Sequence, residues 1–342
     1  MIVRLLALAL VSTLCVTGCS QGGAPVPKEA GQTTLTDLDR PGSQPKVNFF
    51  NTPSSSAWPE FIVSGPQGAL WFSEADADKI GRSTTGAQIA EFALPDGHDP
   101  EGITVGHDGN LWFTEPGANQ IGRMTTAGQV TSFQITGSNP SPRGITAGPD
   151  GNIWYVEYYD SYIGRVTPAG QITRFAIPEA SSYPWDITTG ADGDLWFTES
   201  ATGRIGRFDP RALQFKPSLP VPTPSCWPWG IMLGPDKHIW FTERRGDKLA
   251  VVAGKKIVEF PIAQPGSYPE NITAGSDGNF WFTEMAAGNI GRFNPATGKF
   301  GKIIVLPANS IPIGIASGPD KNIWFTIASY SNPSQIGEVV LH

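Results

Sequence analysis

The sequence predicts an all-β protein, folded as a seven-bladed β-propeller with four antiparallel strands in each blade. One tryptophan recurs at intervals of 41, 42, 42, 44, 41 and 43 residues, at Trp71, Trp112, Trp154, Trp196, Trp240, Trp281 and Trp324. A period near 42 residues is typical of a propeller blade. The 342 residues also include 40 Gly and 31 Pro, which is too rich in turn formers for a helical protein.

Each repeat contains the same four segments in the same order. In the second repeat, an Ile-centred segment (101–105) leads through a turn (106–109) to an aromatic segment (111–115). The Ile-Gly-Arg segment (121–123) and a last strand (130–133) follow. The turns contain the Gly, Pro and Asp that tight hairpins need. Four short segments joined in this way predict one antiparallel blade.

The two ends of the repeat region predict how the ring closes. Residues 335–341 supply a third strand that lacks a fourth, whereas residues 46–50 supply a fourth strand that lacks a blade. We expect the N-terminal strand to complete the last blade, which pairs strand edges that would otherwise favour aggregation. Residues 46–342 are therefore predicted to form one propeller domain.

Residues 1–18 have the pattern of a secretory signal peptide. The apolar run at 5–16 is too short to span a bilayer, and small residues follow it. Residues 16–19, Val-Thr-Gly-Cys, resemble a bacterial lipobox, which implies cleavage before Cys19 and lipidation of that cysteine. The alternative is an ordinary cleavage site with an incidental cysteine. Residues 19–45 are then the lipidated Cys19 and a flexible Gly/Pro-rich tether.

These features predict an exported lipoprotein of the cell envelope. Ser20 follows Cys19, and an uncharged residue there resembles lipoproteins of the outer membrane, so we expect the periplasmic face of that membrane. The lipid would be the only membrane contact. The net charge is −7 and basic runs are short, which excludes the usual nucleic-acid binders. We expect a monomer, and Cys226 to be a buried thiol because no histidine adjoins it.

The positions that vary between repeats predict a binding face. The residue after a recurrent proline differs in size and charge from repeat to repeat, as Glu60, Glu101, Arg143, Trp185, Trp229, Glu270 and Ile313. The residue before that proline varies too, as Trp58, Asp99, Ser141, Tyr183, Trp227, Tyr268 and Ile311. An aromatic wall with a few convergent polar groups is typical of a pocket for a small or peptidic ligand. Alternatively, the large rings fill the centre of the propeller.

Residues that recur in nearly every repeat predict architecture instead. The aromatic segment closes with Glu in six repeats, and Ile-Gly-Arg occurs in five. We expect each closing Glu to pair with the arginine of its own blade, as a contact that stabilises the blade. The recurrent tryptophans are expected to pack between blades.

One phrase of the repeat resembles a known family. Pro-x-Gly-Ile-Thr-x-Gly-Pro-Asp-Gly-Asn-Leu-Trp-Phe-Thr-Glu followed by Ile-Gly-Arg is similar to the repeat of the streptogramin lyases, or virginiamycin B lyases, over nearly all of residues 46–342. The resemblance implies a top-face pocket in which Mg²⁺ helps to open the ester of a cyclic depsipeptide antibiotic by elimination, a carbon–oxygen lyase reaction that confers antibiotic resistance.

The same resemblance implies catalytic histidines after the proline of the fifth and sixth repeats. Trp229 and Glu270 occupy these positions here, and Tyr268 replaces an expected acidic residue, whereas Glu284 matches the family. Without an imidazole, no group there titrates near neutrality unaided.

Two other residues are candidate catalysts. Glu270 would serve as a base if the aromatic wall raised its pKa. His98 is the only histidine expected on the pocket face, although it also suits a solvated loop. The carboxylates of Glu270 and Glu284 are suitable ligands for Mg²⁺ or Ca²⁺.

Two functions remain open from the sequence. One is a streptogramin lyase-like propeller that binds a small or peptidic ligand, with or without metal-dependent lyase activity. The other is a non-catalytic binding or protein-interaction propeller of the cell envelope. A six-bladed sugar-lactone hydrolase fits poorly because the repeats number seven.

Overall fold

The computed structural model describes residues 45–94, 97–331 and 333–341. The chain divides into Met1–Thr33 and Thr34–His342, and every described residue belongs to the second unit. The predicted signal peptide, Cys19 and nearly all of the tether lie outside the described residues. Within the part that the structure describes, no helix is long and apolar enough to cross a membrane.

The described residues form seven antiparallel sheets, one for each predicted blade. The first blade contains β2 (Pro59–Gly65), β3 (Ala69–Glu74), β4 (Lys79–Thr84) and β5 (Ile89–Ala93), with short 3-10 turns at Pro66–Gly68 and Ala75–Ala77. The second contains β6 (Ile103–Val105), β7 (Leu111–Glu115), β8 (Gln120–Met124) and β9 (Val130–Gln134). The third contains β10 (Pro142–Ala147), β11 (Ile153–Glu157), β12 (Tyr162–Val166) and β13 (Ile172–Ala176).

The remaining blades continue in chain order. The fourth contains β14 (Pro184–Thr189), β15 (Leu195–Glu199), β16 (Arg204–Asp209) and β17 (Gln214–Pro220). The fifth contains β18 (Pro228–Leu233), β19 (Ile239–Glu243), β20 (Lys248–Ala253) and β21 (Lys256–Pro261). The sixth contains β22 (Pro269–Ala274), β23 (Phe280–Glu284) and β24 (Asn289–Asn294), whose outer edge pairs with β25 (Lys299–Phe300) and β26 (Ile304–Val305). The seventh contains β27 (Ile311–Ser317), β28 (Ile323–Ala328), β29 (Gln335–Val339) and β1 (Val47–Asn51).

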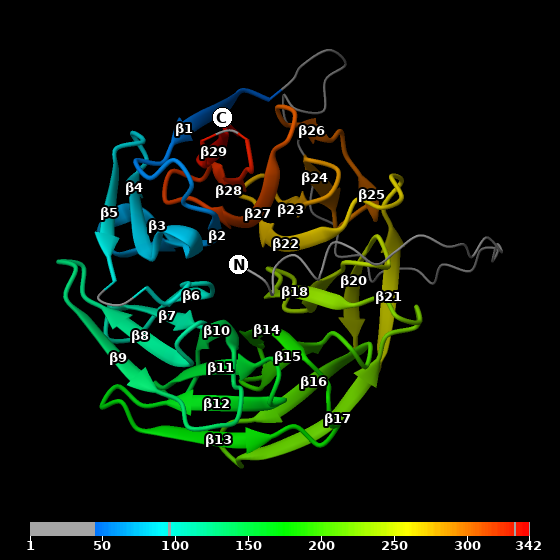
Figure 1. The fold of residues 1–342 in the computed structure, drawn as a ribbon. Helices are drawn as coiled ribbons and strands as arrows, with labels where there is room; N and C mark the ends of the chain where they lie inside the picture. The colour runs from blue at the N-terminus through cyan, green and yellow to red at the C-terminus, as the bar shows by residue number, and fades with distance from the viewer. Residues whose placement is uncertain (1–44, 95–96, 332, 342) are drawn as a thin grey trace. The chain divides into compact units, whose positions relative to one another are not determined.

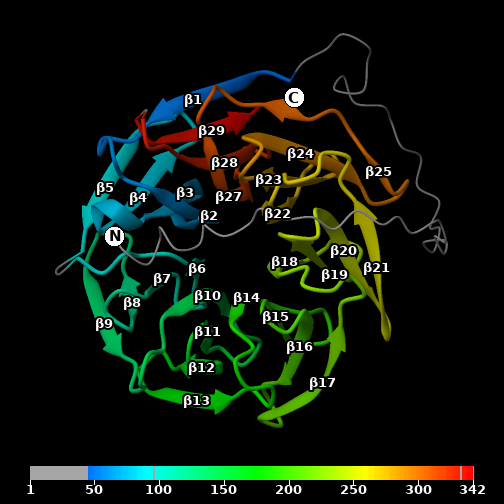
Figure 2. The same cartoon turned by 45° about the vertical axis from the view of Figure 1, so that its right-hand side comes forward.

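The blades close into a ring, as Figures 1 and 2 show. Each inner strand contacts the inner strand of the next blade, and β2 of the first blade contacts β27 of the last. The N-terminal strand β1 completes the seventh blade, since Val47 to Asn51 pair with Val339 to Gln335 of β29. The fold and its predicted closure are therefore confirmed.

The recurrent tryptophans are buried and join neighbouring blades. Trp71 packs in one cluster with Leu111 and Phe113 of the second blade, and Trp154 with Leu195 and Phe197 of the fourth. Six of the seven indoles donate to the aspartate of their own turn, as Trp154 Nε1 does to Asp150 at 3.0 Å. Each turn thus satisfies the one polar atom that its core tryptophan buries.

The predicted pairing of the closing Glu with the Ile-Gly-Arg arginine is wrong. The two residues do not face each other, because the arginine lies opposite the tryptophan in the strand register, as Arg165 does with Trp154. The guanidinium instead lies over that ring, at 4.7 to 5.7 Å from its centroid in all five blades concerned. Attraction between the cation and the ring explains why the arginine recurs.

Candidate functional site

The residues on either side of the recurrent proline lie where each inner strand begins, at the face that we call the top face. In six blades the residue before the proline has a left-handed φ between 45° and 52°, at Trp58, Asp99, Ser141, Tyr183, Trp227 and Tyr268. After the proline, regular pairing resumes only at the isoleucine three residues later in six of the blades, which leaves a bulge. Such backbone strain persists only where the fold imposes it.

A second variable position adjoins the first on this face. The N–H of the residue after the closing Glu donates to the carbonyl of the residue before the proline. Arg244 donates to Trp227 at 2.9 Å in this way, and Met285 donates to Tyr268 at 3.0 Å. Each of these blades therefore presents both variable residues side by side.

Aromatic rings from the third to the fifth blades form a connected array on the top face. The ring of Tyr158 stacks on Tyr183 at 5.1 Å and meets the edge of Trp185 at 5.6 Å. Trp185 stacks on Trp229 at 3.7 Å, and Trp229 is nearly parallel to Trp227 at 6.2 Å. The structure thus brings together four of the predicted binding residues, Tyr183, Trp185, Trp227 and Trp229.

Three arginines lie against these rings. The guanidinium carbons of Arg143, Arg244 and Arg245 lie 5.1, 4.5 and 3.4 Å from the ring centroids of Trp185, Trp229 and Trp227, respectively. Planar guanidinium groups stack on aromatic rings while keeping their N–H donors at the ring edge. We call these rings and arginines the aromatic–arginine array.

Glu270 is held by the array. Its side chain is 4% exposed, and its Oε1 lies 2.5 Å from Nε of Arg244, whose guanidinium also approaches Tyr268 at 5.9 Å from the ring centroid. Burial raises the pKa of the Glu270 carboxyl above its ordinary value, although Arg244 and Trp229 oppose the rise. The Glu270 carboxylate is thus already paired with a cation of the protein, the Arg244 guanidinium.

A similar pair lies on the other side of Arg143. The Arg143 guanidinium forms an ion pair with Glu101, and Glu60 adds a further negative charge that favours the charged arginine. Glu60 and Glu101 are both buried. The predicted acidic side therefore meets the aromatic side at Arg143.

The other predicted residues lie elsewhere on the ring. His98 belongs to the second blade, where its Nδ1 lies 3.6 Å from Oε1 of the closing Glu115. Trp58 packs against the exposed ring of Tyr330 at 4.9 Å, where the first blade meets the seventh. The two candidate catalysts, His98 and Glu270, thus belong to blades that do not adjoin.

The closing glutamates are buried below this face. Glu284 accepts a hydrogen bond from Asn289 Nδ2 at 3.1 Å, and burial raises its pKa. Burial likewise raises the pKa of Glu74 to about 8 and that of Glu243 to about 9. Cys226 is buried as predicted, and burial raises the pKa of its thiol to about 12.

Comparison with known proteins identifies the family. The model of the virginiamycin B lyase family matches residues 32–216 and 215–341. The chain belongs to the virginiamycin B lyase family. A streptogramin B lyase structure is 33% identical, with a TM-score of 0.81 over 87% of this chain and 98% of that chain. No curated protein sequence matches the chain.

Two further structures show how far the likeness extends. A catalytically inactive histidine-to-alanine variant of virginiamycin B lyase from Staphylococcus aureus with quinupristin is 33% identical, with a TM-score of 0.82 over 87% of this chain and all of that one. Hydrazine synthase of Kuenenia stuttgartiensis is 12% identical, with a TM-score of 0.67 over 85% of this chain and 98% of that chain, so it shares the fold alone.

The Mg²⁺ site that the family resemblance implies would use Glu270 and Glu284 in this chain. Among the described residues, no group of three or more His, Cys, Asp or Glu side chains is arranged to hold a metal. Glu270 is paired with Arg244, and a second cation beside that carboxylate would be repelled.

Four residues of the site were not predicted from the sequence: Tyr158, Arg244, Arg245 and Asp186. Arg244 and Tyr158 each follow a closing Glu, at a position that varies as Ala75, Pro116, Tyr158, Ser200, Arg244, Met285 and Ala328. That variation was a readable signal. Asp186 accepts hydrogen bonds from the N–H groups of Ile187 and Ile231, and burial raises its pKa to about 7. It links β14 to β18, and only the fold reveals this role.

Proposed function

We propose that this virginiamycin B lyase family member is a binding propeller of the cell envelope, which holds a small or peptidic ligand on its top face without the histidine-based elimination of the family. The observation that carries the proposal is the filling of the two histidine positions. Trp229 is 4% exposed within the array, and Glu270 is paired with Arg244. Neither side chain is a free base, whereas rings and guanidinium groups suit the binding of a ligand.

Lyase activity is the second candidate, favoured by one observation. Burial raises the pKa of both Glu270 and Glu284, which is the direction that a carboxylate base needs. Activity would require Arg244 to leave Glu270 when the substrate binds.

The experiment uses quinupristin, the ligand of the Staphylococcus aureus structure, with Mg²⁺ and with a chelator. We expect mass spectrometry and chromatography to show the intact cyclic compound under both conditions, and equilibrium dialysis to show binding. Trp185→Ala removes one ring of the array and should weaken binding about tenfold. Val305→Ala, at an exposed position of the outer edge, should leave binding unchanged.

Two results would contradict this proposal. A linear product that forms only with Mg²⁺ would establish the lyase instead. Equal binding by the wild type and Trp185→Ala would place the ligand outside the array.

We further propose, from the sequence of the leader, that the protein is exported and held at the periplasmic face of the outer membrane by lipid on Cys19. Growth with a labelled fatty acid should label the wild type and not Cys19→Ala. An unlabelled wild type would remove the anchor from the proposal.

A further inference from the structure

The seventh blade departs from the others where its second strand ends. In the first six blades that strand ends with a buried glutamate, whereas the corresponding residue of the seventh is Ile327, one residue before the end of β28. The backbone register is unchanged, because Ile327 lies opposite Pro312 just as Glu74 lies opposite Pro59. An apolar side chain therefore occupies the place of a carboxylate.

The first blade has a charged network in this region. Lys79 lies opposite Glu74 in the register, and its Nζ lies 2.6 Å from Oε2 of Glu91 on the outer strand. The N–H and hydroxyl of Ser54, four residues before Trp58, also donate to Glu91. These residues form a charged network that fastens the entering loop to the outer strand.

The fifth blade repeats this network with equivalent residues. Glu243 lies opposite Lys248, whose Nζ lies 2.6 Å from Oε2 of Glu259. Thr223, four residues before Trp227, donates to Glu259 through both its N–H and its hydroxyl. The first and fifth blades, which are far apart in the sequence, thus contain the same charged network.

The seventh blade replaces each member of the network with an uncharged residue. Gln335 lies opposite Ile327, in the place of the lysine. Phe49 lies opposite Gly337 as Glu91 lies opposite Gly81, so a phenyl ring takes the place of the outer carboxylate. Pro307, four residues before Ile311, takes the place of the serine or threonine.

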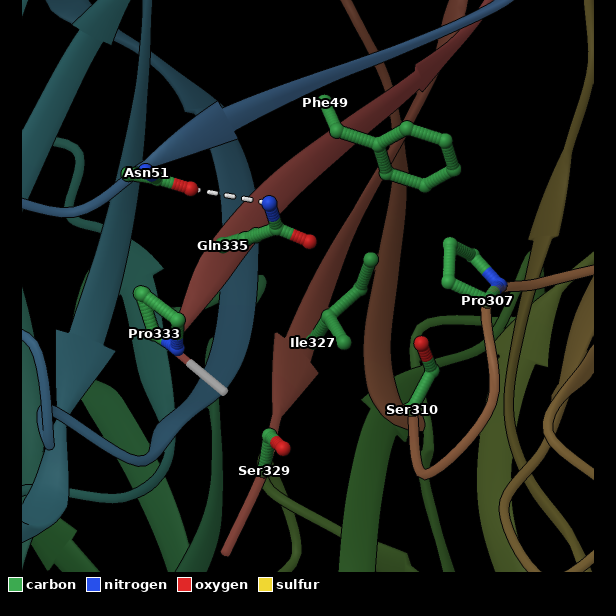
Figure 3. Close-up of a pocket in the computed structure, with 8 residues that line it drawn as sticks. All are labelled: Phe49, Asn51, Pro307, Ser310, Ile327, Ser329, Pro333 and Gln335. Atoms are coloured by element: carbon green, nitrogen blue, oxygen red, sulfur yellow. Dashed lines mark hydrogen bonds between the residues drawn. The ribbon is translucent and has the colours of Figure 1, made fainter. Parts of the chain in front are cut away.

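The replaced side chains leave a cavity of about 390 Å³. Figure 3 shows Phe49, Pro307, Ile327 and Pro333 around it. The Gln335 amide donates to Asn51 Oδ1 at 2.8 Å, and its carbonyl oxygen turns toward the space between Phe49 and Ile327. This volume lies within the range of small-ligand sites, roughly 300 to 1,000 Å³.

We propose that this cavity binds a small, uncharged molecule that carries both an aliphatic group and an N–H donor. Phe49, Pro307, Ile327 and Pro333 supply apolar walls, whereas Asn51, Ser310, Ser329 and Gln335 line the cavity with uncharged polar side chains, and the Gln335 oxygen supplies an acceptor. A charged group is disfavoured because no residue that lines the cavity carries a compensating charge. The site is independent of the proposed function, since the aromatic–arginine array belongs to the third to fifth blades.

The test uses N-acetyl-L-leucinamide and free leucine as a matched pair of probes. They share a side chain, but only leucine carries two charges. The full-length chain is labelled at the isoleucine δ1 methyl groups, and the Ile327 signal is identified from its loss in Ile327→Val. We expect N-acetyl-L-leucinamide to shift the Ile327 signal in a saturable manner, and leucine to leave it in place. No shift up to the solubility limit of the amide would overturn the proposal.

Two variants exclude a non-specific effect. Ile327→Glu combined with Gln335→Lys introduces the two residues that lie opposite each other in the first blade, Glu and Lys, into the cavity wall and should abolish saturation transfer from the protein to N-acetyl-L-leucinamide. The reciprocal change in the first blade, Glu74→Ile with Lys79→Gln, disturbs an equivalent pair away from the cavity and should preserve it.

If the introduced pair prevents folding, Ser310→Phe provides a second route, because a phenyl ring from that position would fill the cavity. Transfer that persists in a folded variant with a filled or recharged cavity would show that the amide binds elsewhere, and would overturn the proposal.

Discussion

Burial strongly raises the pKa values of individual glutamates in this propeller. The side chains of Glu74 and Glu243 are fully buried, and burial raises their pKa values to about 8 and about 9, with Glu91 and Glu259 adding to the rise. The folded protein therefore holds protons that the unfolded chain releases near its ordinary glutamate pKa. The stability that these protonated side chains contribute is fully present below about pH 4.5, and it is lost as the pH rises through about 9.

Glu243→Gln tests this linkage, because the amide stays neutral at every pH. Between about pH 5 and about pH 9, the free energy of unfolding of the wild type should fall relative to that of the variant, by at most about 1.4 kcal/mol for each pH unit. Urea unfolding at several pH values measures the difference. Parallel pH profiles for the two proteins would show that Glu243 is ionised in the folded state.

At the scale of the strand, one glycine explains the Ile-Gly-Arg motif. A Cβ atom at Gly122 of β8 would overlap the ring of Phe113 on β7, and Gly164 meets Tyr155 in the same way. The bare backbone lets the aromatic ring lie across the neighbouring strand. In the fifth blade Ala250 occupies this position beside Phe241, so one blade accommodates the methyl group.

Gly122→Ala should therefore destabilise the propeller by about 1–3 kcal/mol, since the ring has to move within a packed core. The reciprocal Ala250→Gly should cost less, about 0.5–1 kcal/mol, mainly through the backbone entropy of glycine. Urea unfolding compares the two variants with the wild type. A larger loss for Ala250→Gly than for Gly122→Ala would refute the steric explanation.

At the scale of the whole molecule, β1 closes the ring. Phe50 stacks on Trp324 at 5.8 Å, as Phe92 stacks on Trp71 at 5.7 Å within the first blade. Ser334 fastens the same seam, since its hydroxyl accepts from Trp58 N–H at 3.2 Å and its carbonyl accepts from Thr52 N–H at 3.0 Å. The last blade is complete only when both ends of the domain are in place.

A protein that starts at residue 52 should consequently melt at a lower temperature than one that starts at residue 45. It should also self-associate, because β29 becomes an exposed strand edge. Thermal unfolding and light scattering measure both effects. If the shorter protein is monomeric and equally stable, β1 is dispensable for closure.

The ring could be predicted from the sequence because the same pattern of residues recurs seven times, and each recurrence forms one blade with the same packing. The repeated Trp, Gly and turn Asp each appear where the structure needs them, and the unmatched strand at 46–50 indicated the closure. The repeats gave one wrong prediction, the pairing of the closing Glu with the arginine, because these two residues recur together for separate reasons. The aromatic–arginine array could be predicted only in part from the sequence, because the role of Arg244 depends on contacts with Trp229 and Glu270 of neighbouring strands.

The pairing of β1 with β29 also has a consequence for the order of events during synthesis. Asn51 leaves the ribosome 284 residues ahead of Gln335, its partner in the seventh blade. At about 5–20 residues per second, β29 is synthesised roughly 15 to 60 s after β1, the strand with which it pairs. Six blades are made before the circle can close, so a chain that stalls before its last forty residues keeps an unmatched strand at each end.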